Sequence, residues 1–245
     1  MGSNCWDDWK HLFTSKGYSC IVPNWPYKDG CPEELRNRQP DAGIASNRLT
    51  GLTDYYARIA EGKDNPILIG HCMGGLIVQL LLQRGIGSCG VAIHSVPPRG
   101  IFTCKLSSLK AAWDASGLFT SVQQSYMISF RTWQYAIANG MSCDEQKAAY
   151  YKFAIPESKL MIRDTLTAAA HINFNISHSP LLIMSGSNDH FIPAAINYEN
   201  YLKYKHPRSI TEYKECRGRN HLSINQLTWG EDATFVMKWI SRQKL

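Results

Sequence analysis

The stretch that decides the fold is Ile67-Leu-Ile-Gly-His-Cys72-Met-Gly-Gly-Leu-Ile-Val-Gln-Leu-Leu-Leu-Gln83. Its pattern predicts a short apolar strand, a tight turn and an apolar helix. Gly70, Cys72 and Gly74 fit the motif glycine-x-nucleophile-x-glycine, with cysteine at the nucleophile position. In such a turn we expect only small residues to fit at Gly70 and Gly74. The N-terminus of the following helix would favour a thiolate or an oxyanion. The stretch therefore predicts the active-site elbow of an enzyme.

Length and composition limit the possibilities for the rest of the chain. The 245 residues, 44% of them hydrophobic, are enough for one sizeable α/β domain, and we expect a single domain over residues 1–245. The net charge of +6 comes from scattered Lys and Arg residues, which predicts a solvated basic surface and no nucleic-acid partner. The sequence has no signal peptide and no apolar run long enough to span a membrane, so we expect a cytoplasmic protein.

Two sequence features predict that the protein has no metal and no cofactor. The eight cysteines are dispersed, without a Cys-x-x-Cys pair or a histidine at zinc-ligand spacing, which favours reduced thiols over a zinc site. Residues 85–90 spell Gly-x-Gly-x-x-Gly, but this motif ends a predicted helix and precedes a strand. A dinucleotide site needs the opposite order, so we interpret these glycines as a helix end and a turn.

The remaining segments alternate between strand and helix patterns, as expected for a mostly parallel sheet flanked by helices. The long stretch 25–43, rich in Pro, Gly, Asp and Arg, predicts an irregular loop. The expected strands are 18–23, 66–69, 91–95, 180–186 and 210–215, and the expected flanking helices are 5–13, 48–60, 73–84, 194–204 and 232–242.

Residues 99–179 interrupt this alternation with a helical and aromatic segment. A helical insert between two sheet strands predicts a lid over the carboxyl edge of the sheet. Among its aromatic residues, Trp133 is a candidate for substrate contact; the alternative is that these aromatic side chains form the core of the insert. The expected helices of the insert are 106–115, 132–138, 144–153 and 160–169.

Three residues with catalytic chemistry each follow a predicted strand: Cys72, Asp189 and His221. The carboxyl ends of parallel strands lie along one edge of a sheet, so these residues should converge there in the order nucleophile, acid, histidine. Cys72 would attack a carbonyl carbon as a thiolate, His221 would hold the thiol proton and later activate water, and Asp189 would orient His221. The backbone N–H of Met73 would donate to the oxyanion.

The other histidines have weaker support from the sequence. His71 and His190 neighbour the candidate residues and are candidates for shaping the substrate site. His94 lies within the expected strand 91–95, where we expect a core histidine with its hydrogen bonds satisfied.

These motifs resemble the α/β-hydrolase superfamily, in its lidded branch of esterases and lipases. Residues 70–75, Gly-His-Cys-Met-Gly-Gly, differ by one atom from the Gly-His-Ser-Met-Gly-Gly of that family. Residues 185–193, Ser-Gly-Ser-Asn-Asp-His-Phe-Ile-Pro, are similar to its acid loop, and residues 218–221, Gly-Arg-Asn-His, to its histidine loop. The resemblance covers nearly the whole chain and implies an α/β-hydrolase fold with a helical lid. It also implies hydrolysis of a carboxylic ester, lactone or thioester, and dienelactone hydrolases of this superfamily use Cys-His-Asp.

Two departures from the family leave alternatives open. Cysteine replaces serine, either naturally, by engineering or through degradation of the site. The family also has a strand ending in His-Gly before the region matching Trp6, which donates the second oxyanion N–H, and no such motif precedes Trp6 here. The first strands and half the oxyanion hole are therefore absent, or the sequence is incomplete. The small-molecule partner is thus a carbonyl substrate for hydrolysis or acyl transfer, or a ligand for a non-catalytic receptor or carrier.

Overall fold

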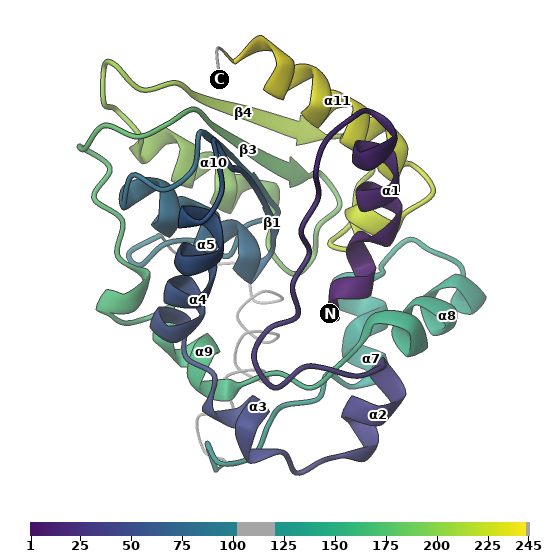
Figure 1. Cartoon of the computed structure of the whole chain (residues 1–245). Coiled ribbons are helices and arrows are strands. Elements are labelled where there is room, and N and C mark those ends of the chain that lie inside the picture. The colour runs from purple at the N-terminus through teal and green to yellow at the C-terminus, as the bar shows by residue number, and fades with distance from the viewer. Residues whose placement is uncertain (102–120, 244–245) are drawn as a thin grey trace.

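The computed structural model describes residues 1–101 and 121–243. Among these residues, one parallel sheet has the strand order β1-β2-β3-β4 (Figure 1). The strands are β1 (Ile67–His71), β2 (Cys89–Ile93), β3 (Leu181–Gly186) and β4 (Thr211–Cys216), and the helices are α5 (Met73–Gln83), α10 (Ala194–Lys203) and α11 (Trp229–Arg242). Helices α5 and α10 follow β1 and β3, because a parallel neighbour is reached only by a crossover, and β4 is followed by the last helix, α11.

Helices cover both faces of this sheet (Figure 1). Leu182 and Met184 pack in the cluster that contains α1 (Asp7–Ser15) and α11, whereas Leu181 and Ile183 pack in the cluster with α5 and Tyr201 of α10. Successive side chains of a strand point to opposite faces, so β2 and β3 can be apolar throughout and buried on both sides. A further helix, α4 (Leu49–Glu61), packs on α5. The predicted parallel sheet with flanking helices is confirmed.

The strand register aligns the carboxyl ends of all four strands. His71 pairs with Ile93, Ile93 with Met184, and Gly186 with Cys216. The loops that leave these strands therefore emerge along one edge of the sheet, where ligands bind in parallel α/β folds.

The N-terminal part of the sheet differs from the prediction. Residues 18–23 form no strand, and Ser19–Val22 make no backbone–backbone hydrogen bond with any described residue. An extended segment becomes a strand only by pairing, and β1 is the outermost strand described on this side. The prediction of a strand over 18–23 is wrong, because the described residues include no neighbouring strand that could pair with it.

The segment 25–43 also differs from the prediction, because it contains two short helices. In α2 (Pro32–Asn37), Pro32 occupies the first position and Glu34 accepts from the N–H of Cys31, while the Asp41 side chain caps α3 (Ala42–Ser46). These capping contacts stabilise single helical turns that lack an apolar periodicity, which is why the periodicity did not predict them.

The regular elements in the described part of the segment between β2 and β3 are short helices joined by irregular loops, with one isolated antiparallel bridge between Tyr126 and Glu157. The expected helix 106–115 lies outside the described residues. The expected helix 160–169 is shorter than predicted, because Thr165 and Thr167 hydroxyls bond the carbonyls three residues earlier and end it. The elements are α7 (Phe130–Thr132), a π-helical turn η2 (Trp133–Ile137), α8 (Cys143–Phe153), α9 (Lys159–Asp164) and η3 (Ala168–Ala170).

Two further observations complete the fold. The seven cysteines within the described ranges are all free thiols. Across residues 1–101 and 121–243, no helix has the length and apolar character needed to cross a membrane.

Candidate active site

Cys72 occupies a strained turn between β1 and α5. Its φ of 57° and ψ of −116° are unusual for a residue with a Cβ. The turn is held by three backbone hydrogen bonds of 3.0 Å: the Cys72 N–H donates to the Ile93 carbonyl, and the Cys72 carbonyl accepts from Gly75 and Val96. The surrounding backbone therefore stabilises the strained conformation.

Glycine is required at one of the two predicted positions of the elbow. A Cβ added to Gly70 would lie 2.2 Å from the Gly74 carbonyl oxygen, so a side chain cannot fit there. A Cβ on Gly74 would meet nothing within 4 Å, and the prediction for Gly74 is wrong. The second crowded position is Gly75, where a Cβ would lie 2.8 Å from the Ser95 Cβ as α5 packs on the end of β2.

Met73 is the first residue of α5. Its N–H has no partner within the helix, because the first N–H groups of a helix lack a preceding carbonyl. This N–H is therefore available to a ligand beside Cys72, together with the partial positive charge of the helix N-terminus.

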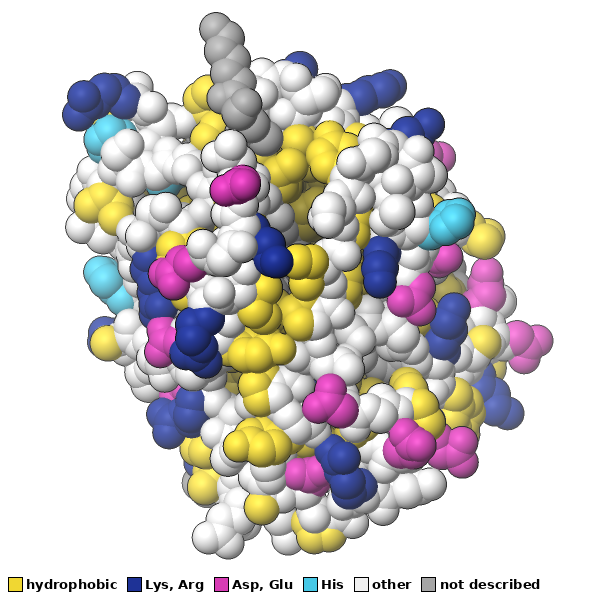
Figure 2. All heavy atoms as spheres, viewed as in Figure 1, with side chains coloured by type: hydrophobic (Ala, Val, Ile, Leu, Met, Phe, Trp, Pro, Cys, Tyr) yellow, Lys and Arg dark blue, Asp and Glu magenta, His cyan; other side chains and the backbone are white. Residues whose placement is uncertain are grey.

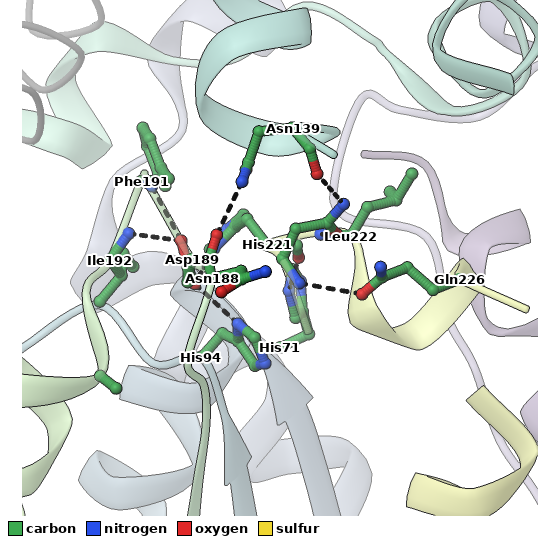
Figure 3. Close-up of polar contacts among 12 residues, drawn as sticks. His71, His94, Asn139, Asn188, Asp189, Phe191, Ile192, His221, Leu222 and Gln226 are labelled. Atoms are coloured by element: carbon green, nitrogen blue, oxygen red, sulfur yellow. Dashed lines mark hydrogen bonds and ion pairs between the residues drawn. The ribbon is translucent and has the colours of Figure 1, made fainter. Parts of the chain in front are cut away.

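Asp189 lies in the turn after β3 and is buried. Its Oδ1 accepts from the backbone N–H groups of Phe191 and Ile192, both at 2.8 Å. Its Oδ2 accepts from two imidazoles, His221 Nδ1 at 2.8 Å and His94 Nδ1 at 2.6 Å (Figure 3). Burial alone would raise the pKa of Asp189, but the two histidines hold it well below its usual range. The carboxylate is thus ionised and held by four donors.

His221 follows β4 and is also buried. The preceding Asn220 anchors the loop, since its N–H donates to Gln226 Oε1 at 2.9 Å and its side-chain amide donates to the Asn139 carbonyl at 2.8 Å. Burial lowers the pKa of His221, but the Asp189 carboxylate and the Cys72 side chain outweigh this and raise it to about 10. With Nδ1 bonded to Asp189, Nε2 is the nitrogen left to exchange a proton with Cys72. The structure therefore brings Cys72, Asp189 and His221 together.

Two other histidines lie beside this chain of contacts. His71 Nε2 donates to the His221 carbonyl at 2.8 Å, and the two rings are 4.7 Å apart. Burial and the neighbouring histidines lower the pKa of His71 well below its usual range, so this ring is neutral. His94 is not inside a strand, as the sequence had suggested; it follows β2 with a φ of 47° and is bonded to Asp189. Its place was missed because an apolar strand pattern shows nothing about a partner 95 residues away.

Among the described side chains, ring nitrogens of His71, His94 and His221 lie within 4.8 Å of one another, a spacing that could hold a metal ion. Sequence spacing could not indicate this cluster, because the three residues lie at the ends of three different strands. In each ring, one nitrogen already bonds to Asp189 or to a backbone carbonyl. The raised pKa of His221 keeps its second nitrogen protonated at neutral pH, so the three rings do not offer a full set of lone pairs to a metal ion.

The remaining predicted site residues lie in different surroundings. Trp133 is buried, lines the cavity described below and has an indole N–H without a hydrogen-bond partner. His190 is exposed and donates from Nδ1 to the Tyr135 carbonyl at 3.1 Å. It lies in the loop after β3, bonded to the insert, and does not line the cavity.

A cavity of about 1010 Å³ opens beside Cys72 and His221. One wall is the outer edge of β1, and the facing wall is the extended segment 18–25, with Trp133 and other residues of the insert closing part of the rest. Figure 2 shows hydrophobic side chains gathered down the middle of this face, over the extended chain that links α1 to α2 in Figure 1. The nucleophile position thus faces a large and mainly apolar space.

Several solved structures share this fold. They include a monoacylglycerol lipase from Paleococcus ferrophilus (TM-score 0.67, 16% identity, 97% of this chain and 89% of that chain) and a methylesterase from Arabidopsis (0.66, 12%, 98% and 94%). Tomato methylketone synthase I bound to 2-tridecanone is also similar (0.68, 12%, 99% and 95%). A comparison with curated proteins found no match. At sequence level, the model of the alpha/beta hydrolase family matches residues 1–226, and the chain therefore belongs to the alpha/beta hydrolase family.

Proposed function

We propose that this protein hydrolyses a carboxylic ester, lactone or thioester through a covalent acyl-Cys72 intermediate. The observation that carries the proposal is the continuous contact from Cys72 through His221 to the ionised Asp189, at an elbow that aims the thiol into the cavity. A Cys–His pair beside a helix N-terminus stabilises a thiolate, which is the nucleophilic form of cysteine.

The proposed reaction has two steps. His221 Nε2 takes the Cys72 proton, the thiolate attacks the carbonyl carbon, and the Met73 N–H donates to the developing oxyanion. The tetrahedral intermediate collapses when the carbon–oxygen or carbon–sulfur bond to the leaving group breaks, and His221 returns the proton to that group. Water then attacks the acyl-Cys72 thioester, gives its proton to His221, and the carboxylic acid leaves as the thiol is restored.

The cavity supports an apolar acyl or alcohol part in the substrate. The similar structures include a lipase, a methylesterase and a methylketone synthase bound to 2-tridecanone, and these names also point to carbonyl compounds as ligands. Trp133 lines the cavity from the insert, which supports a lid function for residues 99–179 and substrate contact by Trp133. We also propose a cytoplasmic location, which the free thiols support because cytosolic cysteines stay reduced.

Two related functions remain as alternatives. In acyl transfer, an acceptor other than water would attack the same intermediate. A non-catalytic receptor or carrier would use the cavity alone, and its large apolar lining favours that function. A carrier does not need an ionised carboxylate and an oriented imidazole, which is why we place hydrolysis first.

The test is to incubate the protein with p-nitrophenyl butyrate and follow product release and intact mass. We expect an initial burst, with a butyryl increment on Cys72 that Cys72→Ala removes. Cys143→Ala is the matched control, because Cys143 is an exposed thiol outside the site, and it should keep the full burst. Binding of a fluorescent fatty acid to both the wild type and Cys72→Ala, without turnover or adduct in either, would instead establish a carrier.

A further inference from the structure

The proposed reaction needs one histidine, yet Asp189 binds two. His94 Nδ1 lies 2.6 Å from Asp189 Oδ2, and His221 Nδ1 lies 2.8 Å from the same oxygen (Figure 3). His94 is 2% exposed, Asp189 4% and His221 2%, so water takes little part in these contacts. Two imidazoles therefore compete for one carboxylate oxygen in a buried setting.

The backbone around His94 is built to hold this ring. His94 has a φ of 47°, a conformation that costs a residue with a Cβ about 1–2 kcal/mol. Its N–H donates to the Met184 carbonyl at 2.8 Å, which fixes the end of β2 against β3. A Cβ on Gly186 would lie 2.6 Å from His94 Cε1, so glycine at the end of β3 leaves the space that the ring occupies. Two neighbouring strands thus accommodate the contact with Asp189.

The charge around this unit is limited to a few groups. His71 faces both rings from β1, at 5.8 Å from His94 and 4.7 Å from His221, and Cys72 faces His221 from the elbow. Arg219, two residues before His221, is engaged by Asp232 and Glu231. Asp189 is therefore the negative charge shared by His94 and His221, and it can balance one imidazolium.

We propose that His94 is a positioning residue that shares the Asp189 carboxylate with His221. It holds the carboxylate in place and limits how strongly the negative charge of Asp189 stabilises the protonated form of the catalytic imidazole. Hydrogen bonds to one oxygen weaken each other, because each donor withdraws charge from the same acceptor. The consequence is chemical: an imidazolium held less tightly by its carboxylate returns its proton to the leaving group more readily.

The test compares His94→Leu, which removes the donor but keeps side-chain bulk, with His94→Asn. The Asn amide reaches the position of Nδ1, donates to Asp189 and tolerates the positive φ. NMR titration of histidine-labelled protein, with His221 assigned through His221→Asn, should show the pKa of His221 raised by about one unit in His94→Leu. In His94→Asn, it should stay near the wild-type value.

A second measurement uses the thiol rather than the base. At pH 6 the raised pKa of His221 keeps the ring protonated with or without His94, so the thiolate–imidazolium pair persists in every variant. Alkylation of Cys72 by iodoacetamide at pH 6 should therefore stay within about twofold of the wild-type rate in His94→Leu. His94→Gly suits the positive φ, lacks the donor and should behave like His94→Leu, which keeps the test valid if the Leu variant fails to fold.

The outcomes separate this proposal from the proposed function. An unchanged His221 titration in both His94→Leu and His94→Gly, or an equal shift in His94→Asn, overturns the sharing of Asp189. If Cys72 is alkylated at the rate of an ordinary thiol in every variant while the pKa of His221 still shifts, then His94 and His221 share Asp189 but the thiolate mechanism fails.

Discussion

The two sides of Cys72 differ in burial and hydrogen bonding. On one side, Asp189, His221, His94 and His71 are buried and each ring has a hydrogen-bond partner. On the other side, β1 is the outermost strand that the structure describes, and the cavity of about 1010 Å³ is lined by this strand and by segment 18–25, in which Ser19–Val22 make no backbone–backbone hydrogen bond with a described residue. The acid–base side is preorganised by strands β2, β3 and β4, whereas the substrate side is bounded by β1 and by extended chain.

This difference indicates which property of the protein depends on which region. Proton transfer should depend on a few buried contacts and be lost when one of them is removed. Substrate preference should depend on the size of the cavity. Substitutions of the residues that line the cavity should therefore change this preference in small steps. The following predictions test that division, from the largest expected effect to the smallest.

Asp189→Asn should cause the largest loss. The amide cannot balance an imidazolium and presents an N–H to one of the rings, so ester hydrolysis should fall about 10³–10⁴-fold. Asp232→Asn is the matched control, because it removes a buried carboxylate that pairs with Arg219 in the histidine loop. This control should lose less than about tenfold in kcat/KM; similar losses in the two variants would mean that loop packing, and not the charge on His221, sets the rate.

The same substitution should change how stability depends on pH. The pKa of His221 is raised from 6.5 to about 10, so its contribution is fully present below pH 6.5 and is lost as the pH rises through about 10. Urea unfolding between pH 6.5 and 10.5 should show this decline in the wild type. Asp189→Asn should be less stable and flatter over that range, and a parallel decline in both proteins would contradict the assignment.

Gly70→Ala and Gly74→Ala test the elbow that joins the two sides. The added Cβ at Gly70 meets backbone atoms of Gly74 and Gly75, which cannot move without breaking the turn, so unfolding should become easier by about 3 kcal/mol. At Gly74 the Cβ enters open space in the first turn of α5, and stability should change by less than about 1 kcal/mol. Denaturant midpoints measure both, and equal losses would show that the sequence motif, not the local space, determines the requirement.

Val22→Trp tests the open side and should have the smallest effect. Val22 lines the cavity, so a larger ring there should reduce kcat/KM for p-nitrophenyl octanoate by about tenfold and leave the acetate nearly unchanged. Leu227→Trp, at a position 92% exposed, is the control for a surface tryptophan. Equal effects of Val22→Trp on both esters would place the acyl chain elsewhere.

The parts of the fold that the sequence predicted correctly are those with a strong local pattern. The run Ile67–Gln83 specified its strand, turn and helix, and the apolar runs at β2 and β3 specified strands covered on both faces. The convergence of Cys72, Asp189 and His221 was predictable for a related reason, since each follows a strand in a parallel sheet. Residues 18–23 were predicted as a strand and form none, because strand formation depends on a neighbour as well as on propensity.

The sequence alone determined the family and an elbow with Cys72 at the position of the nucleophile, because short motifs with strict spacing carry that information. Only the tertiary structure decided that Gly75, and not Gly74, is crowded, since the crowding comes from Ser95 in the loop after β2. It also decided that His94 binds Asp189 and that three histidines meet around the site. The physical reason is that hydrogen bonds and packing act between side chains close in space, whereas residues 94 and 189 are separated along the chain by the whole helical insert.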